Sequence, residues 1–286
     1  MGWHPFDALH RLCRPVRTLP TAVPASTVRG DLGLVDIWSL NYTVDAMATV
    51  ARLWEPLLPP GEQGRARRFR FAHHRLQYMA ARALIRTVLS RYAATRPPDW
   101  RFESGPLGRP AVSSPLTTPR LHFNLSHTDG LVVCAVSVAH DAVGIDVECS
   151  ERASRCEELM DIAFSRNERC FLNTLDPDER PTECLVRWTL KESYSKAIGM
   201  GVSASFDRLS FRSDGRDIRL PSAPFAGQRP ACGWRFAVYE FDTPANIALS
   251  VYTAGAALAV RVGTLSPGEC VPPSPAVRPG TALATS

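Results

Sequence analysis

Residues 188–196 read Trp-Thr-Leu-Lys-Glu-Ser-Tyr-Ser-Lys, and they contain both lysines of the protein. Of the 33 lysines and arginines in the chain, all except Lys191 and Lys196 are arginines. On a helix, Glu192 and Lys196 are one turn apart and lie on the same face. An arginine would serve equally well in an exposed ion pair, whereas a lysine is a compact charge that can donate its proton. The pattern favours a chemical role for lysine here, although an arginine-rich codon composition leaves a mutational accident open.

A second pattern, Gly144-Ile145-Asp146-Val147-Glu148, is typical of a β-strand. Alternate side chains of a strand share a face, so Asp146 and Glu148 point together while Ile145 and Val147 pack behind them. Two adjacent carboxylates repel each other, and a divalent cation with oxygen ligands, such as Mg²⁺, relieves that repulsion. By itself, an Asp-x-Glu pattern more often marks a solvated strand edge.

A third stretch, Phe123-Asn124-Leu125-Ser126-His127, leads from a strand pattern into a polar turn. It places Ser126 and His127 at a strand end, where ligand-binding groups are often found. No Gly-x-Ser-x-Gly elbow surrounds the serine, so the nucleophile of a hydrolase is not indicated. Taken alone, a Ser-His pair at a turn more often makes local hydrogen bonds.

Basic side chains gather in the first part of the helix expected at 61–94. They are Arg65, Arg67, Arg68, Arg70, His73, His74 and Arg75. Such a run is usually a solvated helix surface. The alternative is a phosphate clamp, because the guanidinium fork matches phosphate oxygens. A loop further along the chain, Gly-Pro-Leu-Gly-Arg-Pro, adds Arg109.

Strand and helix patterns alternate through the chain and predict an α+β fold. Helices are expected at 45–57, 61–94, 154–163, 166–174 and 180–198. Strands are expected at 31–38, 99–103, 120–125, 130–138, 142–148, 206–213, 216–220, 233–241 and 245–253. The pattern divides the chain into an N-terminal half, 31–139, and a C-terminal half, 140–254. A disordered tail is expected at 1–30 and a low-complexity tail at 255–286. The halves have similar lengths, which makes a pseudo-repeat plausible without a residue-level repeat.

Composition narrows the functional class. Hydrophobic residues make up 45% of the chain and charged residues 21%, as in soluble globular proteins. No apolar run approaches the ~20 residues of a membrane helix, and the N-terminus lacks the apolar core of a secretory signal. Eight scattered cysteines without a Cys-x-x-Cys pair favour free thiols in the cytoplasm. Most of the net charge of +5 comes from the two tails, so neither a nucleic acid nor a membrane is an expected partner.

The order of FNLSH, GIDVE about twenty residues later and WTLKESYSK, preceded by RRF and GRP, resembles the 4′-phosphopantetheinyl transferases. The resemblance covers roughly residues 32–254 and is to the larger, surfactin-synthetase-activating type. It implies a monomer with two similar α+β halves related by a pseudo-twofold axis, and coenzyme A (CoA) bound between them. It also implies a Mg²⁺-dependent transfer, with Mn²⁺ as a possible substitute, of the 4′-phosphopantetheine arm to a serine of an apo carrier domain. Adenosine 3′,5′-bisphosphate would be released.

The resemblance implies catalytic roles by position. Asp146, Glu148 and Glu192 correspond to the metal-binding carboxylates of the family. Glu192 also corresponds to the base that deprotonates the carrier serine, directly or through water. Lys196 corresponds to the lysine that stabilises and protonates the leaving group, and His127 shares in catalysis. A metal, a lysine and a histidine would neutralise the charge that develops as the diphosphate breaks.

Further positions are implied as CoA contacts. Ser126 and His127 correspond to residues that hold the diphosphate, together with Lys196. Arg65 and Arg109 correspond to basic contacts to the nucleotide phosphates, where family members often have lysine. Looser candidates for the phosphate site are Arg68, His74 and Arg75. The resemblance does not indicate whether the carriers belong to fatty-acid, polyketide or nonribosomal-peptide synthases.

Two other functions remain open on the sequence. A metal-dependent nuclease also uses two acids with a glutamate and a lysine from another element. The usual lysine after the second acid is absent, however, because Cys149 follows Glu148, and the core has no basic excess. A non-catalytic carrier-binding homologue would also keep the fold, but such a copy would be expected to have lost some of the acids and lysines.

Overall fold

The computed structural model describes residues 34–43, 47–105, 108–200, 205–213, 217–222, 225, 228–240 and 245–270. The expected tail at 1–30 lies outside these residues, as does 271–286. All cysteines within the described ranges are free thiols. Within the same ranges, no helix combines the length and the apolar character needed to cross a membrane.

The chain forms helices and strands in two successive sets. The first set is β1 (Leu34–Asn41), α1 (Met47–Trp54), α2 (Pro60–Arg67), α3 (Ala72–Leu89), β2 (Arg101–Ser104), β3 (Pro110–Ser114), β4 (His122–Thr128) and β5 (Leu131–Ser137). The second is β6 (Val143–Cys149), α4 (Ala153–Glu158), α5 (Met160–Ala163), α6 (Arg166–Leu172), α7 (Arg180–Ile198), β7 (Arg212–Ser213), β8 (Ile218–Arg219), β9 (Trp234–Glu240), β10 (Ala245–Tyr252) and β11 (Ala259–Leu265). Short 3₁₀ turns are η3 (Glu55–Leu57), η4 (Pro97–Asp99), η5 (Ser150–Arg152), η6 (Phe206–Arg208), η7 (Ala231–Gly233) and η8 (Pro267–Glu269).

The two main sheets repeat one pairing scheme. The larger sheet has the order β11-β1-β5-β4 and the smaller one β6-β10-β9. In the first half, β1 pairs antiparallel with β5, which pairs antiparallel with β4. In the second half, β6 pairs antiparallel with β10, which pairs antiparallel with β9. This repetition confirms the predicted α+β fold of two similar halves, and the expected boundary at 139/140 falls in the connection between β5 and β6.

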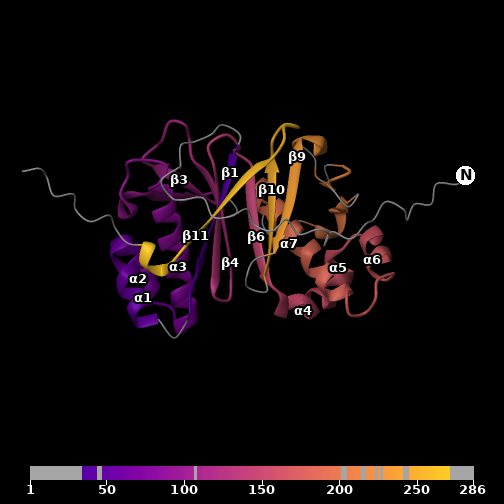
Figure 1. Cartoon of the computed structure of the whole chain (residues 1–286), viewed down its shortest axis with the longest axis horizontal. Helices are drawn as coiled ribbons and strands as arrows, with labels where there is room; N and C mark the ends of the chain where they lie inside the picture. Colours follow the sequence, from indigo (N-terminus) through magenta and orange to yellow (C-terminus); the bar gives the residue numbers. More distant parts are fainter. Residues whose placement is uncertain are drawn as a thin grey trace, which may run out of the picture.

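The two sheets face each other at the centre of the molecule, and the helices cover their outer faces (Figure 1). One apolar cluster lies between the sheets and includes Val35, Val133, Ile145, Val147 and Leu249. On the outer face of the larger sheet, α3 packs in a second cluster. On the outer face of the smaller sheet, α7 packs in a third. Strand alternation sends every second side chain of β6 into the central cluster and the others toward α7.

The C-terminal region corrects one sequence prediction. Residues 255–286 were expected to form a low-complexity tail, but β11 lies within them and pairs in parallel with β1. Arg261 of β11 is opposite Asp36 and binds it through Nε at 2.6 Å and Nη2 at 2.8 Å. The Asp36 carboxylate also accepts a hydrogen bond from Tyr92. The strand β11 depends on pairing with β1, about 225 residues earlier in the chain. The local sequence of 259–265 therefore gives little indication of a strand.

Three local predictions also differ from the structure. The helix expected at 61–94 is two helices, because Phe71 has an extended backbone with ψ of 134° between α2 and α3. The strand β3 was not predicted, and it begins at a proline, which is unusual inside a sheet. The strand expected at 206–213 begins instead with the turn η6, and only the two residues of β7 at its end are a strand. The helix at 180–198 has the predicted bounds.

Candidate active site

Three side chains from three elements meet at the edge where the two sheets come together. Ser126 Oγ on β4 donates a hydrogen bond to Asp146 Oδ1 on β6 at 2.7 Å. Lys196 Nζ on α7 donates to Ser126 Oγ at 2.8 Å and to Asp146 Oδ1 at 2.6 Å. The Lys196 side chain is 27% exposed and that of Asp146 only 5%. The cluster therefore presents a lysine proton at the surface and keeps its anionic partner buried.

Gly144 allows α7 to lie directly against β6. A Cβ atom at this position would lie 2.0 Å from the Ser193 carbonyl oxygen and 2.5 Å from the Ala197 amide nitrogen. Both are backbone atoms of α7, so no side-chain movement could relieve the overlap. Ser193 also hydrogen-bonds Ser250 of β10 at 2.6 Å between the two hydroxyl oxygens. This close approach brings the last turns of α7, with Glu192 and Lys196, above the acidic face of β6.

We expect Gly144→Ala to lower the free energy of unfolding by about 3 kcal/mol, the upper part of the usual range for overpacking, because the added methyl group meets backbone. Gly61→Ala in the first turn of α2 is the matched control, since a Cβ there meets nothing within 4 Å. Urea denaturation followed by circular dichroism measures both. Equal stability of the two variants would contradict this packing.

Asn124 holds the two sheets together beside the cluster. Its Oδ1 accepts a hydrogen bond from the backbone amide of Ile145 at 2.9 Å, and the side chain is buried. The strands β4 and β6 belong to different sheets, so this bond satisfies an amide at an edge without a regular ladder partner. Asn124 and Ser126 lie on the same face of β4. Asn124 bonds the backbone of β6, and Ser126 bonds the Asp146 side chain of the same strand.

The carboxylates beside the cluster have raised pKa values. Burial, followed by the charge of Asp146, raises the pKa of Glu192 to about 7, although Lys196 opposes the shift. Burial and Asp146 also raise the pKa of Glu148, and Arg152 opposes this with a 3.0 Å ion pair. The three predicted metal-binding acids therefore lie close enough to repel one another. Burial is the larger cause at Glu192, and its pKa of about 7 leaves this carboxyl group about half protonated at neutral pH.

One oxygen of Asp146 remains without a partner. Its Oδ1 accepts the bonds from Ser126 and Lys196, whereas Oδ2 is buried and has no hydrogen bond. A buried carboxylate oxygen without a partner is costly, and a divalent cation shared with Glu148 and Glu192 would satisfy it with the oxygen ligands that Mg²⁺ prefers. Within the described ranges, no three His, Cys, Asp or Glu side chains already form a metal-binding group. The residues fit a cation, but their observed arrangement is not a finished coordination sphere.

His127 lies next to the cluster on the opposite face of β4 from Ser126. The residue is exposed, yet enough protein surrounds the imidazole for desolvation to lower its pKa. The positive charge of Lys196 lowers the pKa further, and Asp146 opposes the shift. A neutral imidazole at this position can accept a proton or donate one N–H group to an anion.

Lys191, the second lysine of the opening stretch, has a different environment. It is fully buried, and its Nζ forms a 2.7 Å ion pair with Glu168 Oε2 of α6. It also donates to the carbonyl oxygens of Phe206, at 2.7 Å, and Leu209. Desolvation lowers the pKa of Lys191, and Glu168 opposes this. This lysine ties α7 to α6 and η6 and does not reach the cluster.

The predicted phosphate-binding arginines are placed apart from the cluster. Arg65 is exposed on α2, with its guanidinium carbon 5.5 Å from the centre of the Tyr78 ring. Arg109, just before β3, turns its guanidinium toward backbone carbonyl groups at the end of α7 and the start of β6. Of the looser candidates, Arg68 ends α2, His74 is exposed on α3, and the Nε of Arg75 is buried without a partner.

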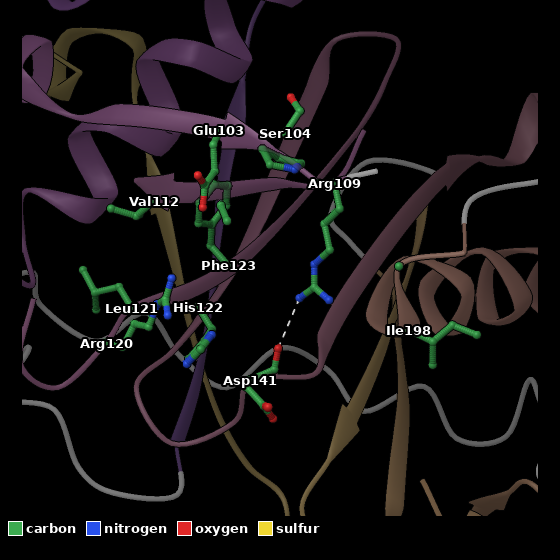
Figure 2. Close-up of a pocket in the computed structure, with 14 residues that line it drawn as sticks. Glu103, Ser104, Arg109, Val112, Arg120, Leu121, His122, Phe123, Asp141 and Ile198 are labelled. Atoms are coloured by element: carbon green, nitrogen blue, oxygen red, sulfur yellow. Dashed lines mark hydrogen bonds between the residues drawn. The ribbon is translucent and has the colours of Figure 1, made fainter. Parts of the chain in front are cut away.

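A polar cavity of about 440 Å³ lies beside the last turn of α7. Figure 2 shows Arg109, Arg120, His122 and Asp141 around it, with Ile198 at the end of the helix. His122 and Ser126 share a face of β4, so the cavity and the cluster lie along the same strand. A second cavity, of about 400 Å³ and mainly apolar, is lined by residues near the β4–β5 turn, including Tyr42 and Cys149.

Sequence reasoning missed several residues that shape this region. They are Asn124, Arg152, Glu168 and Gly144, the last of which allows α7 to pack against β6. Glu168 and Asn124 act on partners 23 and 21 positions away along the chain. Of the four, Gly144 and Asn124 stand in stretches that the sequence analysis singles out, whereas Arg152 and Glu168 do not.

Two family models match consecutive parts of the chain. The model of the 4′-phosphopantetheinyl transferase superfamily matches residues 142–252. The model described as 4′-phosphopantetheinyl transferase, N-terminal, matches residues 49–139. The two matches correspond to the two structural halves, and all three residues of the Ser126–Asp146–Lys196 cluster fall within them.

The 4′-phosphopantetheinyl transferase HetI of Nostoc sp. (strain PCC 7120) is 35% identical over 147 residues, which are 51% of this chain and 61% of HetI. The alignment thus spans less than two thirds of that relative. The 4′-phosphopantetheinyl transferase Sfp of Bacillus subtilis (strain 168) is 31% identical over 169 residues, 58% of this chain and 72% of Sfp. A solved holo-(acyl-carrier-protein) synthase of Bacillus anthracis is 21% identical, with a TM-score of 0.32 over 40% of this chain and 96% of its own.

The chain aligns with 72% of Sfp at 31% identity. The two family models, both of 4′-phosphopantetheinyl transferases, match the chain's two halves. The chain belongs to the 4′-phosphopantetheinyl transferase superfamily.

Proposed function

We propose that the protein transfers the 4′-phosphopantetheine arm of CoA to a serine hydroxyl of an apo carrier domain and releases adenosine 3′,5′-bisphosphate. The observation that carries this proposal is the Ser126–Asp146–Lys196 cluster, with a lysine proton at the surface and a buried, partnerless carboxylate oxygen beneath it. Glu192 and Glu148 lie near enough to Asp146 for its charge to raise the pKa of both. Family membership gives the reaction class, and the cluster supplies side chains suited to it.

The acids would hold the metal ion of the reaction. We propose that Asp146 binds Mg²⁺ through Oδ2, together with Glu148 and Glu192. When bound, the ion would neutralise charge on the diphosphate oxygens. Asp146 Oδ1 keeps its bonds to Ser126 and Lys196, so the same carboxylate orients the lysine and contributes to the metal site.

The remaining steps use the side chains of the chain itself. Glu192, with a pKa of about 7 in the metal-free protein, takes the proton of the carrier serine, directly or through water. The serine oxygen then bonds to the phosphorus of the phosphopantetheine group as the bond from that phosphorus to the bridging oxygen of the diphosphate breaks. Lys196 donates its proton to that oxygen, which leaves with adenosine 3′,5′-bisphosphate. His127 donates an N–H group to the diphosphate. Ser126 can join it only when its single O–H leaves Asp146 Oδ1, to which it donates in the metal-free protein.

The product distinguishes this function from its rivals. Incubation with CoA, Mg²⁺ and an apo carrier should release adenosine 3′,5′-bisphosphate, measured by liquid chromatography, and a carrier with alanine in place of the acceptor serine should give none. Carrier binding without product would indicate a non-catalytic homologue. Cleavage of plasmid DNA in Mg²⁺, without product from CoA, would indicate a nuclease.

The pKa of Glu192 predicts how metal binding depends on pH. Its carboxyl group must lose a proton to bind a cation, so affinity should rise about tenfold per pH unit below pH 7 and level off above it. Electron paramagnetic resonance of free Mn²⁺, titrated with protein between pH 5.5 and 8.5, measures this dependence. Glu192→Gln is the control and should bind more weakly, with a flatter profile. A wild-type affinity that is constant across this range would contradict the role of Glu192 as a ligand.

A further inference from the structure

Arg109 joins three backbone segments. Its Nη1 donates to the Ala197 carbonyl oxygen at 2.7 Å, and its Nη2 donates to the carbonyl oxygens of Val143 at 3.1 Å and Asp141 at 3.4 Å. Ala197 is in the last turn of α7, and Val143 is the first residue of β6. Arg109 itself stands before β3, in the N-terminal half. Figure 2 shows its side chain extended from the β2–β3 turn toward Asp141.

The contact to Ala197 completes the end of α7. The last carbonyl groups of a helix have no partner within the helix. At this end, the amides of Met200 and Gly199 satisfy the carbonyls of Ser195 and Lys196, and Arg109 satisfies that of Ala197. Gly199 has a left-handed φ of 72°, and the Cδ of Arg109 passes 4.0 Å from the position of a Cβ there. A cation at this end also interacts favourably with the helix dipole.

The geometry suits an arginine. Nη1 and Nη2 are separate nitrogens held in one plane, and each carries two N–H groups. One of them faces the helix end and the other the β6 segment, so a single side chain bonds both. A lysine has one nitrogen, which cannot stand at both positions. The carboxylate of Asp141, whose charge acts on Arg109, is already bound by Arg229 with both oxygens, at 2.9 Å and 2.7 Å.

We propose that Arg109 is a positioning residue that fastens the last turn of α7 to the start of β6. Ala197 directly follows Lys196, and Val143 is three residues before Asp146. The bonds of Arg109 to Ala197 and Val143 therefore hold the backbone next to both partners of the 2.6 Å contact between Lys196 and Asp146. Holding both segments keeps the lysine nitrogen within reach of Asp146 and Ser126. The catalytic consequence rests on the proposed function, whereas the fastening itself does not.

A direct contact between Arg109 and a nucleotide phosphate is the competing role. The side chain borders the 440 Å³ cavity, but its terminal nitrogens are engaged by carbonyl groups. The two roles predict different results for Arg109→Lys. A phosphate contact tolerates lysine, which keeps the charge, and its loss in Arg109→Ala weakens nucleotide binding. A fastening role predicts that both variants loosen the end of α7 while nucleotide binding persists.

Hydrogen exchange of the full chain measures the fastening. We expect Arg109→Lys and Arg109→Ala to speed exchange of the Gly199 and Met200 amides at least tenfold. Arg229→Lys is the matched control, because it alters a nearby arginine that binds the Asp141 carboxylate and no α7 carbonyl, and it should leave these amides unchanged. If Arg109→Ala does not fold, Arg109→Lys alone decides.

Two solution measurements complete the test. Calorimetry should show that Arg109→Lys binds adenosine 3′,5′-bisphosphate within about twofold of the wild type. In a turnover assay, the kcat of Arg109→Lys should be at least tenfold below that of the wild type, while its KM for CoA stays within about twofold of the wild-type value. Unchanged exchange at Gly199 and Met200 in both variants would overturn the proposal. The exchange result stands even if the protein proves not to be a transferase.

Discussion

Replacing Lys196 by arginine should lower kcat about a hundredfold and leave CoA affinity within a few-fold of the wild type. Arginine keeps the positive charge, so the electrostatic attraction for the diphosphate persists. It does not release a proton in proteins, so the leaving oxygen loses its acid, and such catalysts contribute roughly 10² to 10⁴ in rate. The planar guanidinium also cannot occupy the place of one nitrogen that lies 2.8 Å from Ser126 Oγ and 2.6 Å from Asp146 Oδ1.

Turnover at saturating CoA and carrier, combined with calorimetric CoA binding, measures this prediction. Lys196→Met is the companion variant and should lose both affinity and rate, because it removes the charge as well as the proton. Arg219→Lys, at a largely exposed position, should match the wild type. Near-normal turnover of Lys196→Arg would show that proton donation does not explain why this position is a lysine.

The other lysine should matter for stability. Lys191→Met is expected to lower the free energy of unfolding by about 4 kcal/mol, because removing one partner of a buried ion pair leaves the other charge without compensation. The partner left behind is Glu168, which has no exposed surface. Its remaining cation, Arg187, is 3.5 Å away. The carbonyl oxygens of Phe206 and Leu209 lose their donor in the same variant.

A double-mutant cycle tests the origin of this loss. Glu168→Gln removes the stranded charge with little change of shape, so adding it to Lys191→Met should restore a substantial part of the lost stability. Urea denaturation of the four proteins gives the coupling. A loss below about 1 kcal/mol in Lys191→Met, or a double variant no more stable than the single one, would contradict a buried pair as the cause.

The sequence predicted those parts of the site that follow local periodicity. Strand alternation correctly placed Ile145 and Val147 in the core between the sheets, with Asp146 on the other face. Helical spacing placed Glu192 and Lys196 on one side of a helix whose bounds agree with the structure. The roles of the acids as metal ligands stay predictions, because chemistry of this kind depends on a bound ion.

The remaining features depend on partners far away in the chain. The strand β11 pairs with β1 across more than 220 positions, and Arg261 meets Asp36 only in that pairing. The two lysines look alike in the sequence, but one binds a glutamate from α6 and the other an aspartate from β6. Arg109 binds backbone carbonyl groups, which leave no pattern in a sequence. Tertiary packing decides each of these cases.

The most direct test of the account is the intact mass of an apo carrier domain after incubation with this protein, CoA and Mg²⁺. We predict a gain of one phosphopantetheine arm, abolished by EDTA and strongly slowed in Lys196→Arg. Carriers from fatty-acid, polyketide and nonribosomal-peptide synthases would show which class is served. If none gains mass while calorimetry shows CoA binding, the proposed transfer reaction is contradicted.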